Sequence, residues 1–257
     1  MPKVEKHAPG SFCWVELATT DQNSAKQFYS TLFGWKPADF PIGPSEVYTM
    51  FQLGGGDAAA GYTMREEERK SAPPHWNLYI AVASADDAAK HAAELGGKVI
   101  APPFDVMAFG RMAVIMDPTG AVFRVWEAKQ TIGTTVGGEP GTVCWADLNT
   151  PDVPRARQFY SALFGWQIAP GEHDPSGYLH IKNGDQFIGG MPPDAGQLPP
   201  HWILYYQVTD CDTSTAKVKE MGGKVMMAPM TLENVGRFSV VADPQGAAFS
   251  LFQPMAG

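Results

Sequence analysis

The sequence predicts an α+β protein made of two similar halves, each with two β-α-β-β-β units. An internal repeat is the first observation, because QFYSTLFGW at 27–35 returns as QFYSALFGW at 158–166. A second observation is periodicity: in each half a short apolar strand precedes a helical pattern twice. Two homologous halves are therefore fused in tandem. Three further motifs continue the repeat: PPHW at 73–76 and 199–202, GGKV at 96–99 and 222–225, and DPxGA at 117–121 and 243–247.

The first unit of each half is predicted by its helix. In the first half a strand over 11–17 precedes a helix that places Phe28, Tyr29 and Leu32 on one face. Gly34 ends this helix, since glycine tolerates the left-handed backbone of a helix C-terminus. The second copy adds Pro154 near the helix start, where a missing N–H costs nothing. The expected segments that follow are strands over 35–39, 47–53 and 58–64 and a polar loop over 65–74.

The second unit of the first half shows the same order at lower resemblance. Gly96-Gly97 end its helix, and the repeat spacing shortens by five residues between Trp166 and His201, which predicts a shorter loop there. The Gly- and Thr-rich stretch 128–140 predicts a linker. We therefore expect domains over 10–127 and 141–254. The expected elements of this second unit are a strand over 76–82, a helix over 85–95 and strands near 99, 112–116 and 122–126.

Composition excludes several classes of protein. A net charge of −8, without a cluster of Lys and Arg, argues against nucleic acid as a partner. No stretch reaches the roughly 18 apolar residues of a membrane span, and no apolar leader follows Met1. Three cysteines in 257 residues cannot form a disulfide framework. We expect a cytoplasmic protein, a monomer or a homodimer, that has no contact with membranes.

The repeated motifs resemble those of a known family. A strand followed by DxxxAxxFYxxLFGW (21–35 and 152–166), then GR (110–111 and 236–237) and DPxGA, is similar to the glyoxalase/bleomycin-resistance/dioxygenase family, the vicinal oxygen chelate superfamily. The resemblance covers nearly the whole chain and is strongest to tandem members labelled glyoxalase-like or hydroxylase. It implies paired modules that curl into U-shaped clefts around a ligand. The superfamily includes lyases, dioxygenases, epimerases, thiol transferases and drug-sequestering proteins, so the fold does not select a reaction.

The resemblance also implies a divalent metal held by His, Gln or Glu on the first and last strands of a domain. Counted from the motifs, these positions are Trp14 and Trp145 in the first strands, with Arg124 and Ser250 in the last. Neither an indole nor a guanidinium donates a lone pair to a metal. We therefore predict no metal or other cofactor, and a divalent metal remains the alternative if the strand register is shifted. The other positions that were counted also lack His and Glu: Asn77, Ile203, Gly61 and Gly190.

Alternation along the strands predicts which side chains face the clefts. Tyr48, Tyr178 and His180 could add to the cleft walls. Aromatic walls suit planar or apolar ligands. The predicted ligand-binding residues are Trp14, Asn77, Tyr79, Arg124 and Trp126 in the first half and Trp145, Tyr205, Ser250 and Phe252 in the second.

Four residues are candidates for acid–base chemistry: Glu16, Asp147, His75 and His201. A buried carboxylate beside a tryptophan can have a raised pKa and act as a general base. We expect Glu16 instead to form a salt bridge with Arg124, whereas Asp147 lacks that partner and could find His201, His180 or water. Each of the two histidines is expected to cap the start of a strand after its Pro-Pro turn, with catalysis as the other interpretation.

Two functions follow from these residues. The first is a small-molecule binding protein of the drug-sequestering type, with aromatic clefts and no metal. The alternative is an enzyme of the same superfamily, a lyase, isomerase or dioxygenase, that depends on a metal or uses Asp147 or Glu16 with a histidine. A third, weaker possibility is that one half is only a packing partner.

Overall fold

The computed structural model describes residues 3–44, 46–172, 176–193 and 198–255. The first half contains β1 (Phe12–Thr19), α1 (Gln22–Phe33), β2 (Lys36–Pro41), β3 (Val47–Leu53), β4 (Gly56–Thr63), α2 (Glu66–Ser71), β5 (His75–Ala81), α3 (Ala85–Glu94), β6 (Lys98–Val106), β7 (Gly110–Met116) and β8 (Val122–Ala128). The second half contains β9 (Val143–Asn149), α4 (Val153–Phe164), β10 (Gln167–Pro170), β11 (Leu179–Asn183), β12 (Gln186–Met191), β13 (His201–Gln207), α5 (Cys211–Glu220), β14 (Lys224–Leu232), β15 (Gly236–Ala242) and β16 (Ala248–Pro254).

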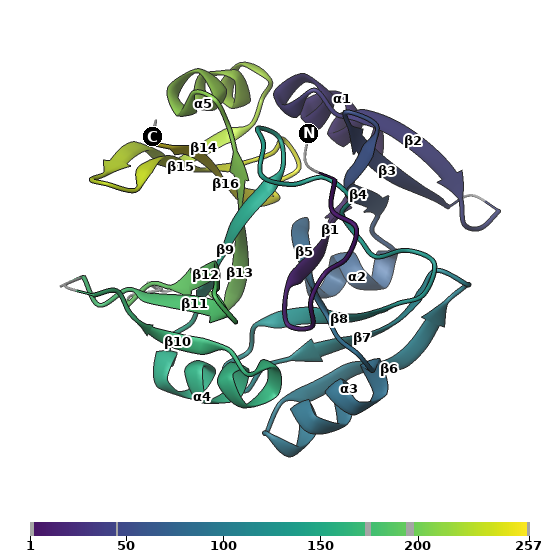
Figure 1. The fold of residues 1–257 in the computed structure, drawn as a ribbon. Helices are drawn as coiled ribbons and strands as arrows, with labels where there is room; N and C mark the ends of the chain where they lie inside the picture. The colour runs from purple at the N-terminus through teal and green to yellow at the C-terminus, as the bar shows by residue number, and fades with distance from the viewer. Residues whose placement is uncertain (1–2, 45, 173–175, 194–197, 256–257) are drawn as a thin grey trace.

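Each half forms one eight-stranded sheet. The strand orders are β2-β3-β4-β1-β5-β8-β7-β6 and β10-β11-β12-β9-β13-β16-β15-β14. Two β-α-β-β-β units join edge to edge in each sheet, through antiparallel pairing of β1 with β5 and of β9 with β13. Figure 1 shows two curved sheets placed back to back, with their openings on opposite sides. The α+β prediction of four such units in two tandem domains is confirmed.

Helices α1 and α4 form where the sequence predicts them, because their caps are local. The Asp21 side chain accepts the Ser24 N–H at 3.0 Å, and Asp152 does the same for Arg155 at 3.1 Å. Gly34 and Gly165 end the two helices with φ of 72° each, in the left-handed region that glycine adopts without strain.

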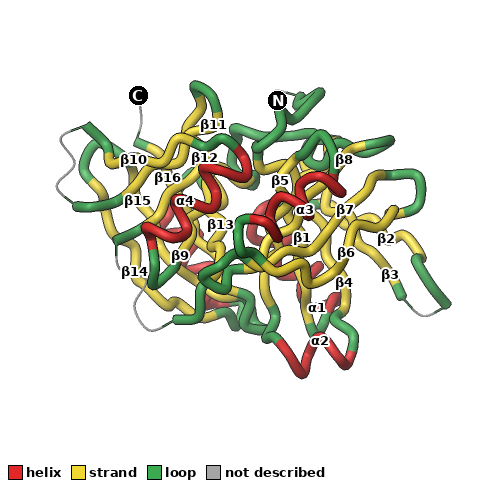
Figure 2. The backbone as a smooth tube through the Cα atoms, turned by 90° about the horizontal axis from the view of Figure 1, so that it is seen from below, coloured by secondary structure: helices red, strands yellow, loops and turns green. Residues whose placement is uncertain are grey.

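The loop predicted over 65–74 is wrong in part, because α2 forms within it. The Arg65 N–H donates to the Glu68 carboxylate at 2.8 Å, and the Lys70 ammonium pairs with Glu66 at 3.0 Å. Acidic residues fill the first turn and basic residues the last, which favours a helix without any apolar stripe. Figure 2 shows α2 projecting at one margin of the molecule. In the second half, the described part of the shorter connection between β12 and β13 contains no helix.

The main core lies between the two sheets and belongs to both halves. Helix α1 contacts α5, and α3 contacts α4, so the helices of one half lie beside those of the other (Figures 1 and 2). Rings from α1 pack on the second sheet, with Phe33 at 4.9 Å from Tyr206 and 6.1 Å from Phe249 between ring centroids. The Tyr29 hydroxyl donates to Asp243 of the second half at 3.0 Å. None of the described helices is long and apolar enough to cross a membrane.

Candidate functional site

The strand register places the predicted cleft residues on the inner face of each sheet, the face opposite the helices. In the first sheet Trp14 pairs with Tyr79 and Tyr79 with Arg124, while Glu16 pairs with Asn77. Trp126 lies one row further along, opposite Ala81. In the second sheet the corresponding pairs are Trp145 with Tyr205, Tyr205 with Ser250, Asp147 with Ile203 and Phe252 with Gln207.

A cluster around Glu16 ties three strands of the first inner face together. The Tyr48 hydroxyl from β3 donates to Oε1 of Glu16 at 2.9 Å, and the Tyr79 hydroxyl from β5 donates to Oε2 at 2.9 Å. The Trp14 indole donates to the Tyr48 hydroxyl at 3.1 Å. Glu16 is 7% exposed, so its carboxylate is stabilised by these hydroxyls more than by water. We call these four residues the first acid–tyrosine cluster.

The second half repeats this arrangement around Asp147. The Tyr178 hydroxyl donates to Oδ1 of Asp147 at 2.5 Å, and the Tyr205 hydroxyl donates to Oδ2 at 2.8 Å. The Trp145 indole is shared between Oδ1 of Asp147 and the Tyr178 hydroxyl, at 2.9 Å each. These four residues form the second acid–tyrosine cluster. His180 packs edge-on against Tyr178, with 5.0 Å between ring centroids.

The predicted salt bridge between Glu16 and Arg124 is wrong. No ion pair within 4.0 Å joins these two described residues, and the Arg124 guanidinium donates instead to Oδ1 of Asn77. It also lies over the Tyr79 ring, 5.5 Å from the centroid. The register explains the difference: Arg124 pairs with Tyr79, one row away from Glu16, so tyrosine hydroxyls reach the carboxylate first.

His75 and His201 cap the starts of β5 and β13. In each histidine Nδ1 lies 2.8 Å from a backbone carbonyl oxygen two residues earlier, that of Pro73 or Pro199. A carbonyl only accepts, so Nδ1 carries the proton in both rings. Neither ring is a hydrogen-bond partner of Glu16 or Asp147, whose carboxylates contact tyrosines instead. The structure therefore does not bring the four candidate acid–base residues together.

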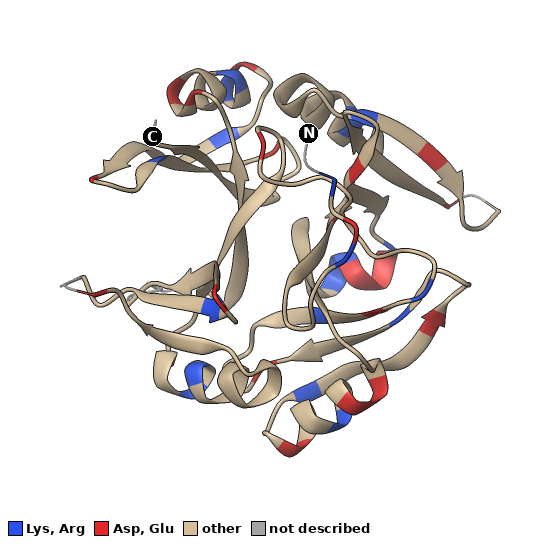
Figure 3. Cartoon of the chain, in the orientation of Figure 1, with Lys and Arg blue, Asp and Glu red and all other residues tan. Residues whose placement is uncertain are grey.

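The two inner faces differ in how far they are filled. Six buried residues of the first face pack into a cluster separate from the main core: Cys13, Trp14, Ala60, Tyr79, Met112 and Trp126. The second face is more open, since Trp145, Tyr205 and Phe252 are half-buried. Strand pairing there aligns Phe252 with Phe238 and Phe238 with Met230, which is 42% exposed. In Figure 3, Lys, Arg, Asp and Glu lie mainly on helices and loops, and the second sheet is mostly without them.

Comparison with known proteins identifies the family. The model of the Glyoxalase/Bleomycin resistance protein/Dioxygenase superfamily matches residues 11–125, and that of a glyoxalase-like domain matches 144–252. The protein named "Putative glyoxylase CFP32" of Mycobacterium tuberculosis (strain CDC 1551 / Oshkosh) is 41% identical over 99% of this chain and 98% of its own length. The chain belongs to the glyoxalase/bleomycin resistance protein/dioxygenase superfamily.

Further members of the superfamily are similar along their length. Anthracycline biosynthesis protein DnrV of Streptomyces peucetius is 33% identical over 99% of this chain and 97% of its own. The Mn(II)-bound glyoxalase from Novosphingobium aromaticivorans matches with a TM-score of 0.67 and 16% identity, over 95% of this chain and 82% of that chain. A mutant 4-hydroxymandelate synthase from Streptomyces coelicolor matches with a TM-score of 0.65 and 12% identity, over 98% of this chain and 95% of that chain. At these identities the solved structures show the fold alone.

The residues at the superfamily's usual metal positions do not fit a metal ion. Trp14 and Trp145 occupy the first strands and Arg124 the last strand of the first half, and none of these side chains offers a lone pair to a metal. Ser250, the remaining position, is a neutral hydroxyl. Among the described residues, no group of three or more His, Cys, Asp and Glu is placed to hold a metal. The acid–tyrosine clusters lie on the faces where the ligands would stand.

Burial raises the pKa of Asp147 above its usual value of 3.8, although the hydroxyls of Tyr178 and Tyr205 and the Trp145 indole act in the opposite direction. A proton is therefore bound more tightly in the folded state. The stabilisation that follows is fully present below pH 3.8 and is lost as pH rises through the folded pKa. We expect the free energy of unfolding, relative to Asp147→Asn, to fall as pH rises from 3.8. Urea unfolding of both proteins from pH 4 to 7 measures this, and a difference that grows with pH would contradict it.

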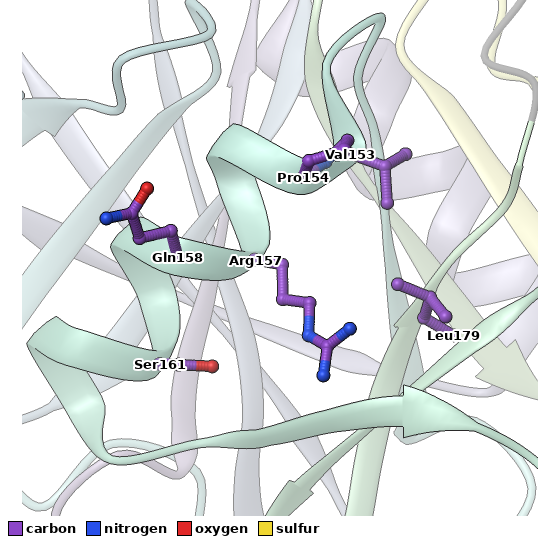
Figure 4. Close-up of a pocket in the computed structure, with 6 residues that line it drawn as sticks. All are labelled: Val153, Pro154, Arg157, Gln158, Ser161 and Leu179. Atoms are coloured by element: carbon purple, nitrogen blue, oxygen red, sulfur yellow. The ribbon is translucent and has the colours of Figure 1, made fainter.

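A surface cavity of about 500 Å³ lies away from both inner faces, between α4 and β11 (Figure 4). Val153, Pro154 and Leu179 form its apolar wall, and Arg157 points into it. At the equivalent place in the first half, Gln22, Lys26, Asp39 and Thr49 form a hydrogen-bonded network, with Lys26 at 2.7 Å from Asp39. The described residues that line the cavity in the second half form no such network.

Proposed function

We propose that the inner faces of the two sheets bind small planar or apolar molecules and use no metal. The observation that carries this proposal is the repeated acid–tyrosine cluster, which stands in both halves in place of a metal-binding set. Such a cluster offers tryptophan and tyrosine rings as a wall and a fixed pattern of polar groups beside it. A mostly apolar surface with a few well-placed polar groups is typical of small-molecule sites.

The dimensions of the second inner face suit a long, flat ligand. Its rings run across the sheet, and the Tyr205 ring is 6.1 Å from that of Phe238 between centroids. From Met230 on β14 to Trp145 on β9 the face spans five strands, roughly 19 Å at the usual strand spacing, and its rings lie in two neighbouring rows of the register. Two relatives are named anthracycline biosynthesis proteins, and an anthracycline is a planar fused-ring molecule that suits such a face.

Binding accounts for the clusters better than acid–base catalysis does. Both oxygens of Glu16 and of Asp147 already accept hydrogen bonds from tyrosines, so each carboxylate is held by phenol donors rather than presented alone to a substrate proton. Burial raises the pKa of Tyr205 and Tyr178, which keeps both phenols protonated and excludes a phenolate base.

Replacement of Trp145 by alanine tests the proposal. Because Trp145 is a half-buried wall of the second face, we expect at least a tenfold weaker affinity for daunorubicin, measured by the fluorescence anisotropy of that ligand. Met255→Ala removes an exposed apolar side chain outside the face and should leave the affinity unchanged. If Trp145→Ala lowers the unfolding midpoint but leaves the affinity for daunorubicin unchanged, the second half is a packing partner. The same conclusion follows if the unaltered protein does not bind daunorubicin.

A further inference from the structure

One half-buried cation of the first inner face has no carboxylate partner. Arg124 is half-buried, and its hydrogen bond goes to the neutral Asn77 amide. Three other arginines do pair with carboxylates: Arg65 with Glu46 at 3.0 Å, Arg111 with Asp86 at 2.6 Å and Arg237 with Asp212 at 2.6 Å. Among the described residues no carboxylate comes within 4.0 Å of Arg124. A guanidinium out of bulk water and unpaired is costly unless an anion joins it.

Asn77 adds a second unsatisfied donor beside this cation. Its side chain is 3% exposed, its Oδ1 accepts from Arg124, and its Nδ2 is buried without a hydrogen-bond partner. A buried N–H left unpaired destabilises the unliganded protein, so an acceptor placed there would be bound favourably. His75, two residues earlier on the same strand face, donates from Nδ1 to the Pro73 carbonyl. The guanidinium and the amide thus present N–H donors next to each other.

The nearby carboxylates define what kind of anion can enter. Glu16 and Glu68 both lie near enough to raise the pKa of Arg124, although burial acts against them. The charge of Glu16 is shared with two tyrosine hydroxyls, and Glu68 accepts from the Tyr62 hydroxyl at 2.9 Å. An anion that does not contact the guanidinium would be repelled by both carboxylates. A carboxylate that contacts the guanidinium directly gains two parallel hydrogen bonds, which offsets this repulsion.

We propose that the first inner face binds an anionic ligand, the carboxylate of a planar aromatic acid, with Arg124 and Asn77 on the carboxylate, beside the packed cluster that contains Trp14 and Trp126. The inference rests on the proposed binding function and separates the two halves. In the second half Ser250 stands opposite Tyr205 and Ile203 opposite Asp147, where the first half has Arg124 and Asn77. That face has no cation in this row, so it takes an uncharged ligand.

Calorimetric titration with 2-naphthoate and its neutral isostere 2-naphthamide tests the inference. The unaltered protein should bind 2-naphthoate at least tenfold more tightly than 2-naphthamide, at one site per chain. Arg124→Met keeps the apolar stem and should remove this preference. Arg157→Met removes a cation that lies in the surface cavity and should retain it. Equal affinity of the unaltered protein for both ligands, or a preference that survives Arg124→Met, overturns the inference.

A gain of function keeps the test decisive if Arg124→Met does not fold. The double variant Ser250→Arg with Ile203→Asn installs the same pair in the second face, and it should bind a second equivalent of 2-naphthoate. Failure to gain that site would count against the pair as the anion anchor. If 2-naphthamide binds while 2-naphthoate shows no preference, only the anion site is wrong. If neither ligand nor daunorubicin binds, the binding function itself is wrong.

Discussion

Replacement of Trp35 by alanine should lower the free energy of unfolding by about 3–5 kcal/mol, the usual cost of deleting a buried aromatic side chain. Trp35 is 2% exposed and packs on Tyr29, with 5.7 Å between ring centroids, and on Tyr206 of the other half, also at 5.7 Å. Its indole N–H donates to the Gly141 carbonyl at 2.8 Å, just before β9 begins. The same side chain thus fills the core and joins the halves.

Urea unfolding followed by far-ultraviolet circular dichroism measures this effect. Trp35→Phe should lower the free energy of unfolding by less, because it keeps most of the buried apolar area. It still loses the hydrogen bond to Gly141, and a buried carbonyl left unpaired costs about 1–3 kcal/mol. Trp166→Ala, the equivalent change in the second half, should match Trp35→Ala, because its indole donates to Gly10 of the first half at 2.9 Å. We expect one cooperative transition for every variant. Two transitions, with only one shifted, would show that the halves fold separately.

The elements that sequence reasoning predicted are those whose signals are local. Asp21, the apolar face of α1 and Gly34 all lie within one stretch of chain, and the repeat supplies a second reading of the same pattern from Asp152 to Gly165. Strand alternation likewise placed Trp14 and Tyr79 on one face, because the two-residue period of a strand needs no tertiary information.

The partners of the buried carboxylates could not be predicted with the same rules. Alternation predicts the face on which a residue lies, but not which residues of the neighbouring strands it pairs with. The cross-strand register decides that the Glu16 carboxylate contacts Tyr48 and Tyr79 rather than Arg124. The repeat did contain the signal: a carboxylate, a tryptophan and two tyrosines recur together in both halves. Helix α2 was missed for another reason, since short-range caps and charges stabilise it without apolar periodicity.

The two clusters differ by one methylene in the acid, and the neighbouring strand compensates for it. Glu16 stands opposite Ala60 on β4, whereas the shorter Asp147 stands opposite Gly190 on β12. A Cβ at Gly190 would lie 1.9 Å from the Tyr178 hydroxyl and 2.1 Å from its ring carbon Cζ. The missing Cβ therefore lets the Tyr178 ring lie across the backbone and reach the shorter acid, 2.5 Å away.

Gly190→Ala should therefore expel the Tyr178 ring and remove its hydrogen bond to Asp147. A hydrogen bond to a buried charged group contributes about 1.5–3 kcal/mol, and we expect the free energy of unfolding to fall by that amount. The pKa of Asp147 should rise further, because the bond from Tyr178 lowers it in the unaltered protein. Urea unfolding and the pH dependence of stability measure the two effects. Unchanged stability would mean that Tyr178 does not need the space above Gly190.

The first half supplies the control for this change. Asp147→Glu combined with Gly190→Ala recreates in the second half the acid and small residue of the first, where Glu16, Ala60 and Tyr48 coexist. We expect the double variant to be more stable than the sum of its single changes by about 0.5–3 kcal/mol, the coupling found for residues in one network. Additive effects would mean that the acid and the opposite residue act independently on stability. A positive coupling would mean that the length of the acid and the size of the opposite residue together decide whether the tyrosine reaches the carboxylate.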